Sequence, residues 1–207
     1  MPNVAADPSS QNGKHAYDPR ASATFERDGS AWWEVGPLAP KRYRLRLGGL
    51  FKTGWLAALC SGLARRNLSI HTAHARLAHD GSWIAELTVI PLDSTVDVMG
   101  LPYLSMAQND EQTECDEALL DAYTLVETSD HGGTLLLELR AKDTVGLLGK
   151  LLKLGRKAGL YVIEMHIETH DEQAKDSLWL SIDGAGPLDA ARTTLDALLR
   201  ARLRASQ

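Results

Sequence analysis

The pattern of hydrophobic and polar positions in this chain of 207 residues occurs twice, once from Tyr43 and again from Leu135, with a constant offset of 92 residues. Each copy reads as an alternating strand, a loop that ends in glycine, an amphipathic helix and two further alternating strands. The helices run up to Asn67 and Gly159, residue types that readily take the left-handed conformation that ends a helix. We therefore expect two copies of one small α+β unit, with helices on one face of antiparallel sheets.

The expected boundaries follow from where this pattern starts and stops. Residues 1 to about 30 mix proline, serine, asparagine, aspartate and glycine with few large apolar residues, which predicts a flexible N-terminal arm over 1–41 with a possible short strand at 31–35. The first copy is expected over 42–128 and the second over 134–207. Residues 92–133 fit the repeat less well than the rest of the chain.

Each copy shows only three clear strands, so a fourth strand has to be supplied from elsewhere. In the second copy a helix is expected from Pro187 nearly to the end of the chain, which leaves little room for a strand. The sequence leaves three sources open: Trp32–Val35, Tyr123–Thr128 or another chain.

Strand alternation places His74 and His166 at equivalent positions on the outer face of the sheet, together with Trp179. A paired metal site or a pH-sensing site is conceivable there, since His166 and His170 lie on one strand face, four residues apart in sequence. Solvated or interface histidines are the better supported interpretation. An outward tryptophan indicates a covered surface.

Composition narrows the classes of partner. The formal net charge of −5 and the pI near 5.8 argue against a protein that grips nucleic acid, which needs a basic face. The N-terminus has no apolar run typical of a signal sequence, and no stretch is long and apolar enough to span a membrane. Cys60 and Cys115 do not resemble a disulfide framework. We expect a cytoplasmic protein whose two marginal units pack on each other, on a protein partner or in a homo-oligomer.

Enzyme signatures do not occur in the sequence. It has no nucleophile-elbow motif, no zinc-protease motif and no glycine-rich phosphate loop. We expect no catalytic activity and no cofactor or metal.

Three segments of the second copy carry a family resemblance: Asp143–Leu147, the strand with Met165, Ile167 and Thr169, and Asp176–Leu180 followed by Asp183–Leu188. Together they resemble the ACT domain over about 70 residues. The nearest likeness is to the tandem ACT tail of bacterial PII uridylyltransferases that sense glutamine. The resemblance implies a ferredoxin-like βαββαβ fold. It also implies modules that pair and bind an amino acid or another small metabolite near the loop between the first strand and the first helix.

That loop is also chemically suited to a carboxylate, because the first N–H groups of a helix have no partner within the helix and lie at its positive end. The resemblance implies that the ligand would bind at this loop. The candidate ligand-binding residues of the second copy are Asp143, Thr144, Val145, Gly146 and Leu147. The weaker candidates in the first copy are Lys52, Thr53, Gly54 and Trp55, where Phe51 replaces the acidic residue. Asp143 is equally suited to capping the helix, and both glycines to close packing.

We therefore expect a regulatory protein in which two ACT-like modules bind a small molecule, most simply an amino acid, at their interface. Binding would alter contact with a protein partner. The alternative is a ligand-free module for protein interaction or oligomerisation.

Overall fold

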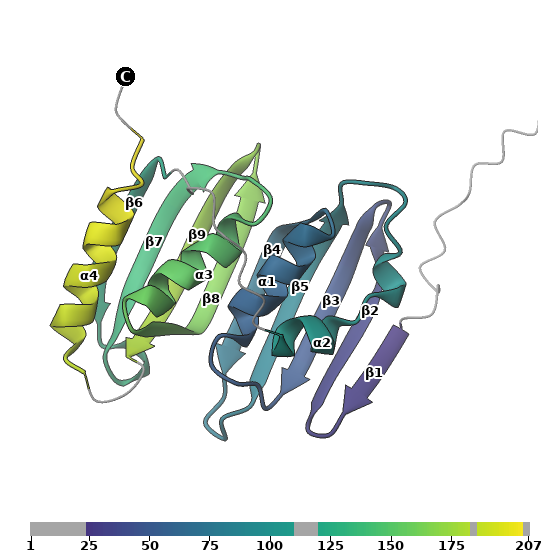
Figure 1. The fold of residues 1–207 in the computed structure, drawn as a ribbon, viewed down its shortest axis with the longest axis horizontal. Coiled ribbons are helices and arrows are strands. Elements are labelled where there is room, and N and C mark those ends of the chain that lie inside the picture. The colour runs from purple at the N-terminus through teal and green to yellow at the C-terminus, as the bar shows by residue number, and fades with distance from the viewer. Residues whose placement is uncertain (1–23, 110–119, 183–185, 205–207) are drawn as a thin grey trace, which may run out of the picture.

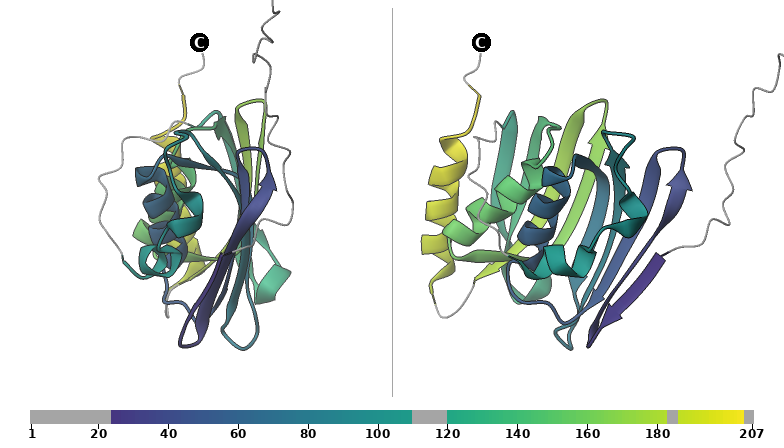
Figure 2. Two further views of the ribbon diagram at one scale, coloured as in Figure 1. Left: turned by 90° about the vertical axis from the view of Figure 1, so that its right-hand side faces the viewer. Right: turned by 45° about the vertical axis from the view of Figure 1, so that its right-hand side comes forward.

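The computed structural model describes residues 24–109, 120–182 and 186–204, which form one antiparallel sheet with helices on a single face (Figures 1 and 2). The strands are β1 (Thr24–Asp28), β2 (Ala31–Ala39), β3 (Arg42–Gly49), β4 (Leu68–Leu77), β5 (Trp83–Pro91), β6 (Ala122–Thr128), β7 (Thr134–Lys142), β8 (Leu160–His170) and β9 (Gln173–Ile182). The helices are α1 (Trp55–Arg65), α2 (Tyr103–Gln108), α3 (Leu147–Lys157) and α4 (Leu188–Arg200), with short 3-10 turns at η1 (Val98–Gly100) and η2 (Asp130–Gly132).

Two segments of the structure have the same order of elements. We call β3, α1, β4 and β5 the first repeat, and β7, α3, β8 and β9 the second repeat. Helices α1 and α3 each have 11 residues and start 92 residues apart. The strand order is β1-β2-β3-β5-β4-β8-β9-β7-β6, so the second repeat runs across the sheet as the mirror order of the first.

The sequence led us to expect separate sheets, whereas the structure has one sheet of nine strands and one continuous hydrophobic core. The repeats join where β4 and β8 pair antiparallel, from Thr72 opposite Glu168 to Arg76 opposite Glu164. Each of these two strands carries a β-bulge at the equivalent place, after Ile70 and after Val162. Both strands would otherwise be sheet edges with unpaired backbone groups, and pairing satisfies them.

The fourth strand of each half lies N-terminal to its repeat. Strand β2 pairs with β3, and β6 pairs with β7. Two of the three sources that the sequence left open, Trp32–Val35 and Tyr123–Thr128, are therefore both used within the chain.

Part of the segment predicted as an N-terminal arm forms strands. Strands β1 and β2 form a hairpin over Thr24–Ala39, where the sequence indicated an arm with a short strand at 31–35. Trp33 and Val35 of β2 are buried in the core, and this burial holds the hairpin on the sheet. Residues 1–23 of the predicted arm lie outside the described residues.

Helices α1 and α3 start and end as their sequences predict. Each is preceded by a glycine in a left-handed conformation, Gly54 with φ 90° and Gly146 with φ 84°. Each is followed by a residue with positive φ, Asn67 at 55° and Gly159 at 76°. Their apolar sides pack on the sheet and on each other over the join between β4 and β8 (Figure 1). In the described part of the chain, no helix is long and apolar enough to cross a membrane.

Candidate functional site

The two glycine corners lie on either side of the join, and each faces the helix of the other repeat. A Cβ atom placed on Gly54 would lie 3.1 Å from Nη1 of Arg156 on α3. A Cβ atom placed on Gly146 would lie 3.4 Å from Cβ of Ala64 on α1. Ala64 and Arg156 are themselves 92 residues apart. The corners are therefore equivalent in backbone position and different in side-chain chemistry.

The first corner borders a cavity of about 330 Å³ that both repeats line, which we call the crevice. This volume lies at the lower end of the range of about 300–1,000 Å³ usual for small-molecule sites. The first repeat contributes Phe51, Thr53, Gly54, Trp55, Leu56, Ala57, Leu77, Gly81 and Trp83. The second repeat contributes Leu152, Arg156, Leu160, Tyr161, Val162 and Ile182.

Aromatic rings form one wall of the crevice. Phe51 stacks on Trp55 with ring centroids 4.5 Å apart, and Trp55 meets Trp83 edge-on at 5.4 Å. Trp55 is 3% exposed, and none of the described residues accepts a hydrogen bond from its indole Nε1. A buried N–H without an acceptor is costly to the folded state.

The second corner encloses far less space. The cavity beside Gly146 measures about 20 Å³, close to the minimum needed for one water molecule. All five residues predicted for this site line it, namely Asp143, Thr144, Val145, Gly146 and Leu147. They are joined there by the start of β4, Leu68–Ile70, and by Cys60 of α1. The predicted residues are thus assembled between the repeats around a small space.

A buried acidic residue, Asp176, lines the same small cavity. It is 2% exposed, and its Oδ1 atom has no hydrogen-bond partner among the described residues. Burial, together with the nearby charge of Asp143, raises the pKa of Asp176 to about 7. Burial likewise raises the pKa of Asp143, against a hydrogen bond from Thr169 that lowers it. The second corner is therefore rich in acceptors, whereas the first is rich in donors.

Sequence reasoning missed several residues of these sites. Asp176 could have been found, because it alternates with Ala174 and Leu178 on the inner face of β9. Arg156 and Tyr161 carry no local signal, since they reach the crevice only because α3 and β8 lie against the first repeat. Of the weaker candidates, Thr53, Gly54 and Trp55 line the crevice, whereas Lys52 is exposed and is not among its lining residues.

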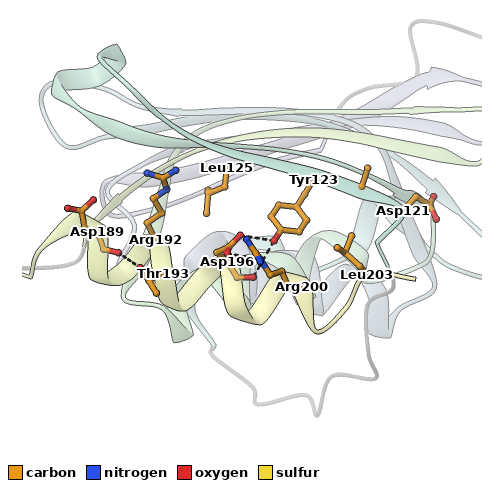
Figure 3. A pocket seen from close by; sticks show the side chains of 10 residues that line it. Asp121, Tyr123, Leu125, Asp189, Arg192, Thr193, Asp196, Arg200 and Leu203 are labelled. Atoms are coloured by element: carbon orange, nitrogen blue, oxygen red, sulfur yellow. Dashed lines mark hydrogen bonds and ion pairs between the residues drawn. The ribbon is translucent and has the colours of Figure 1, made fainter. Parts of the chain in front are cut away.

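A larger groove of about 910 Å³ lies between β6 and α4 (Figure 3). Several of its charged side chains already have partners. Asp196 accepts a hydrogen bond from the Tyr123 hydroxyl at 2.7 Å and pairs with Arg200 at 2.8 Å. Arg192 pairs with Glu127 at 3.1 Å. These side chains already have hydrogen-bond or ion-pair partners, whereas Trp55 and Asp176 each have a buried polar atom with none among the described residues. The groove is therefore the weaker candidate for a ligand.

The open face of the sheet carries the predicted histidine cluster. His74 and His166 are exposed there, and Nε2 of His166 lies 2.9 Å from Oε1 of Glu164. Trp179 lies beside His166 with ring centroids 5.3 Å apart. Within the described ranges, no group of three or more His, Cys, Asp or Glu side chains is arranged to hold a metal ion.

Comparison with known proteins gives one partial likeness. The chain is 30% identical over 93 residues to an ACT domain-containing protein, ACR6, of Arabidopsis thaliana. The match covers 45% of this chain and 20% of that protein, so the chain spans about a fifth of its length. No family model matches the chain, and no solved structure matches it.

This likeness supports an ACT domain in the chain. The α+β architecture, with helices on one face of an antiparallel sheet, fits an ACT-like fold.

Proposed function

We propose that this chain is a regulatory protein in which two ACT-type modules, joined edge to edge, bind a small molecule between them. The observation that carries the proposal is the crevice of about 330 Å³ beside Gly54, which both repeats line. A guest there touches Trp55 of one repeat and Tyr161 of the other. An amino acid is the ligand that the resemblance to sensory ACT tails implies, and other small carboxylates fit the same space.

Ligand binding would regulate through the join between the repeats. A guest that contacts both sides adds stabilising contacts only while β4 and β8 remain paired in their present register. Occupancy therefore favours one relative placement of α1 and α3, and a protein partner that contacts both halves senses this placement. The proposal assigns no catalytic step and no cofactor to the chain.

The second corner has a different role in this proposal. Asp143 and Gly146 form a site that admits little more than a water molecule, and Asp143 contacts Thr169. An amino acid would bind there only if the loop from Asp143 to Leu147 opened. We propose the crevice as the primary site and this corner as its closed counterpart.

A thermal-shift screen of the common amino acids and of small apolar carboxylates tests the proposal. A ligand that binds only the folded state raises the melting temperature, by an amount equivalent to about 2.7 kcal/mol at 100 times its Kd. Stabilisation by at least one compound, lost when Leu77→Trp fills the crevice, supports the proposal. Absence of any shift at millimolar concentrations contradicts it. Ile84→Trp, on the exposed face of the neighbouring strand β5, is the matched control.

The alternative function, a ligand-free interaction module, is favoured by a different observation. Strand β6 is at an edge of the sheet, and its Val126 is 46% exposed. An edge strand with an exposed apolar side chain can pair with another chain. This candidate predicts self-association or partner binding that no small molecule alters, and that Val126→Lys weakens.

A further inference from the structure

The crevice and the second corner differ in whether their polar groups donate or accept hydrogen bonds. This difference identifies a ligand class. The inference rests on the proposed function, because it concerns the same crevice. Phe51 stands where the second repeat has Asp143, and Leu77 stands where it has Thr169. Ala85 faces the core at the position that Asp176 occupies in the second repeat. The two acidic side chains and the threonine of the second corner are thus replaced by apolar side chains in the first.

Donor groups remain at the crevice after this replacement. The buried indole Nε1–H of Trp55 has no acceptor among the described residues. Leu56 and Ala57, which also line the crevice, belong to the first turn of α1, where N–H groups have no carbonyl one turn earlier in the helix. Arg156 lies at the crevice with five N–H donors, so it can bind an anion in addition to its other partners.

Among the described residues that line the crevice, no side chain supplies a counter-charge for an ammonium group. None of the described residues that line the crevice is Asp or Glu. An α-amino acid bound there would lose water from its ammonium group without gaining an ion pair. The remaining wall is apolar, formed by Trp83, Leu77, Leu160 and Val162.

We propose that the crevice binds a small carboxylic acid with an apolar body and without an α-ammonium group. The carboxylate accepts from Trp55 Nε1 and the first turn of α1 and faces the guanidinium of Arg156. The apolar body lies against Trp83 and Leu77. The volume of about 330 Å³ accommodates a single ring or a short branched chain, since a cavity of about 150 Å³ already holds benzene.

Three probes that share one apolar body separate the charge requirements. Isothermal titration of the full chain with 3-phenylpropanoate, L-phenylalanine and phenethylamine compares carboxylate alone, carboxylate with ammonium, and ammonium alone. We expect 3-phenylpropanoate to bind at least about 10-fold more tightly than L-phenylalanine, and phenethylamine to give no measurable heat.

Two variants locate the bound carboxylate. Trp55→Phe removes the indole donor and keeps the ring, and we expect it to weaken 3-phenylpropanoate about 10-fold. Arg156→Gln is expected to weaken it similarly, whereas Lys157→Gln, the neighbouring exposed cation outside the crevice lining, leaves the Kd unchanged. Because the Trp55 indole N–H has no acceptor among the described residues, the melting temperature of unliganded Trp55→Phe should remain within a few degrees of the parent chain.

The outcomes separate this inference from the proposed function. Equal or tighter binding of L-phenylalanine, weakened by Leu77→Trp, overturns the ligand class and supports the crevice as a binding site. Binding of 3-phenylpropanoate that neither Trp55→Phe nor Arg156→Gln weakens overturns the assigned contacts. Absence of binding by 3-phenylpropanoate also overturns the inference, and the proposed function fails as well only when the broader thermal-shift screen is negative.

Discussion

His74 and His166 lie directly opposite each other in the β4–β8 pair, with ring centroids 4.6 Å apart. They also hold equivalent positions in the two repeats, 92 residues apart. A residue that pairs with its own equivalent lies on the pseudo-twofold axis, so this axis passes between the two imidazoles. The two glycine corners on either side of the axis share a backbone arrangement and differ in the side chains that line them.

Because the two repeats share one core, we expect equivalent leucines on α1 and α3 to contribute equally to the free energy of unfolding. Leu59 of α1 and Leu151 of α3 are both buried in the single core. We expect Leu59→Ala and Leu151→Ala each to lower the free energy of unfolding by about 2–5 kcal/mol. Denaturant unfolding followed by fluorescence and by circular dichroism measures this loss. The two probes should give one coincident transition in each variant, because the repeats share a core.

Two separate transitions, with only one shifted by each variant, would contradict the single core. Lys157→Ala, at an exposed position on α3, serves as the control and should change stability by less than about 0.5 kcal/mol.

Asp176 predicts a specific dependence of stability on pH. Its folded-state pKa of about 7 is above the ordinary value for aspartate of about 3.9, so the folded chain holds this proton more tightly than the unfolded chain. Its contribution to stability is fully present below about pH 4 and is lost as the pH rises through 7. Asp176→Asn stays uncharged, so we expect this variant to exceed the parent chain in stability at pH 8, by on the order of 2 kcal/mol.

Urea unfolding between pH 4 and pH 8 measures this difference, with the exposed Glu172→Gln as the control. Parallel pH profiles for Asp176→Asn and the parent chain would show that Asp176 is ionised in the folded state.

The left-handed backbone at the two glycine corners predicts similar losses of stability when either glycine is replaced by alanine. Gly54 and Gly146 have φ values of 90° and 84°, a region that costs residues with a Cβ atom about 1–2 kcal/mol. We expect Gly54→Ala and Gly146→Ala to lose about that much stability each by thermal unfolding. Gly54→Ala should in addition weaken binding in the crevice, because the new methyl group crowds Arg156.

Gly186→Ala is the control for this pair, since a Cβ atom there meets nothing within 4 Å and the residue lacks a positive φ. If Gly54→Ala were as stable as the parent chain, the left-handed corner would not be required by the fold.

The elements of this fold could largely be predicted from sequence, because local signals specify them. Alternation predicted β7, β8 and β9, and the residue types at Asn67 and Gly159 marked where the helices end. The partner of an edge strand has no such local signal. The sequences of β4 and β8 show the alternation of any half-buried strand and contain no signal that the two strands pair with each other. The sequence therefore did not predict the single sheet.

The site could be predicted only as far as its backbone. The glycine positions identified both corners, and the residues from Asp143 to Leu147 do line a cavity. The size of each cavity depends on side chains from the opposite repeat, such as Ala64 and Arg156, whose positions across the join depend on the pairing of β4 with β8. For this reason the sequence favoured the corner with Asp143 as the ligand site, whereas the larger of the two corner cavities lies beside Trp55.

The central claim is that a small molecule occupies the crevice between the repeats, and the indole N–H resonance of Trp55 reports on it most directly. We predict that titration of the 15N-labelled chain with 3-phenylpropanoate or L-phenylalanine moves the Trp55 indole signal, assigned by its loss in Trp55→Phe. The Trp179 indole, on the open face, should stay in place. An unmoved Trp55 signal at saturating concentrations of both compounds, and with every stabilising compound from the thermal-shift screen, would contradict the claim.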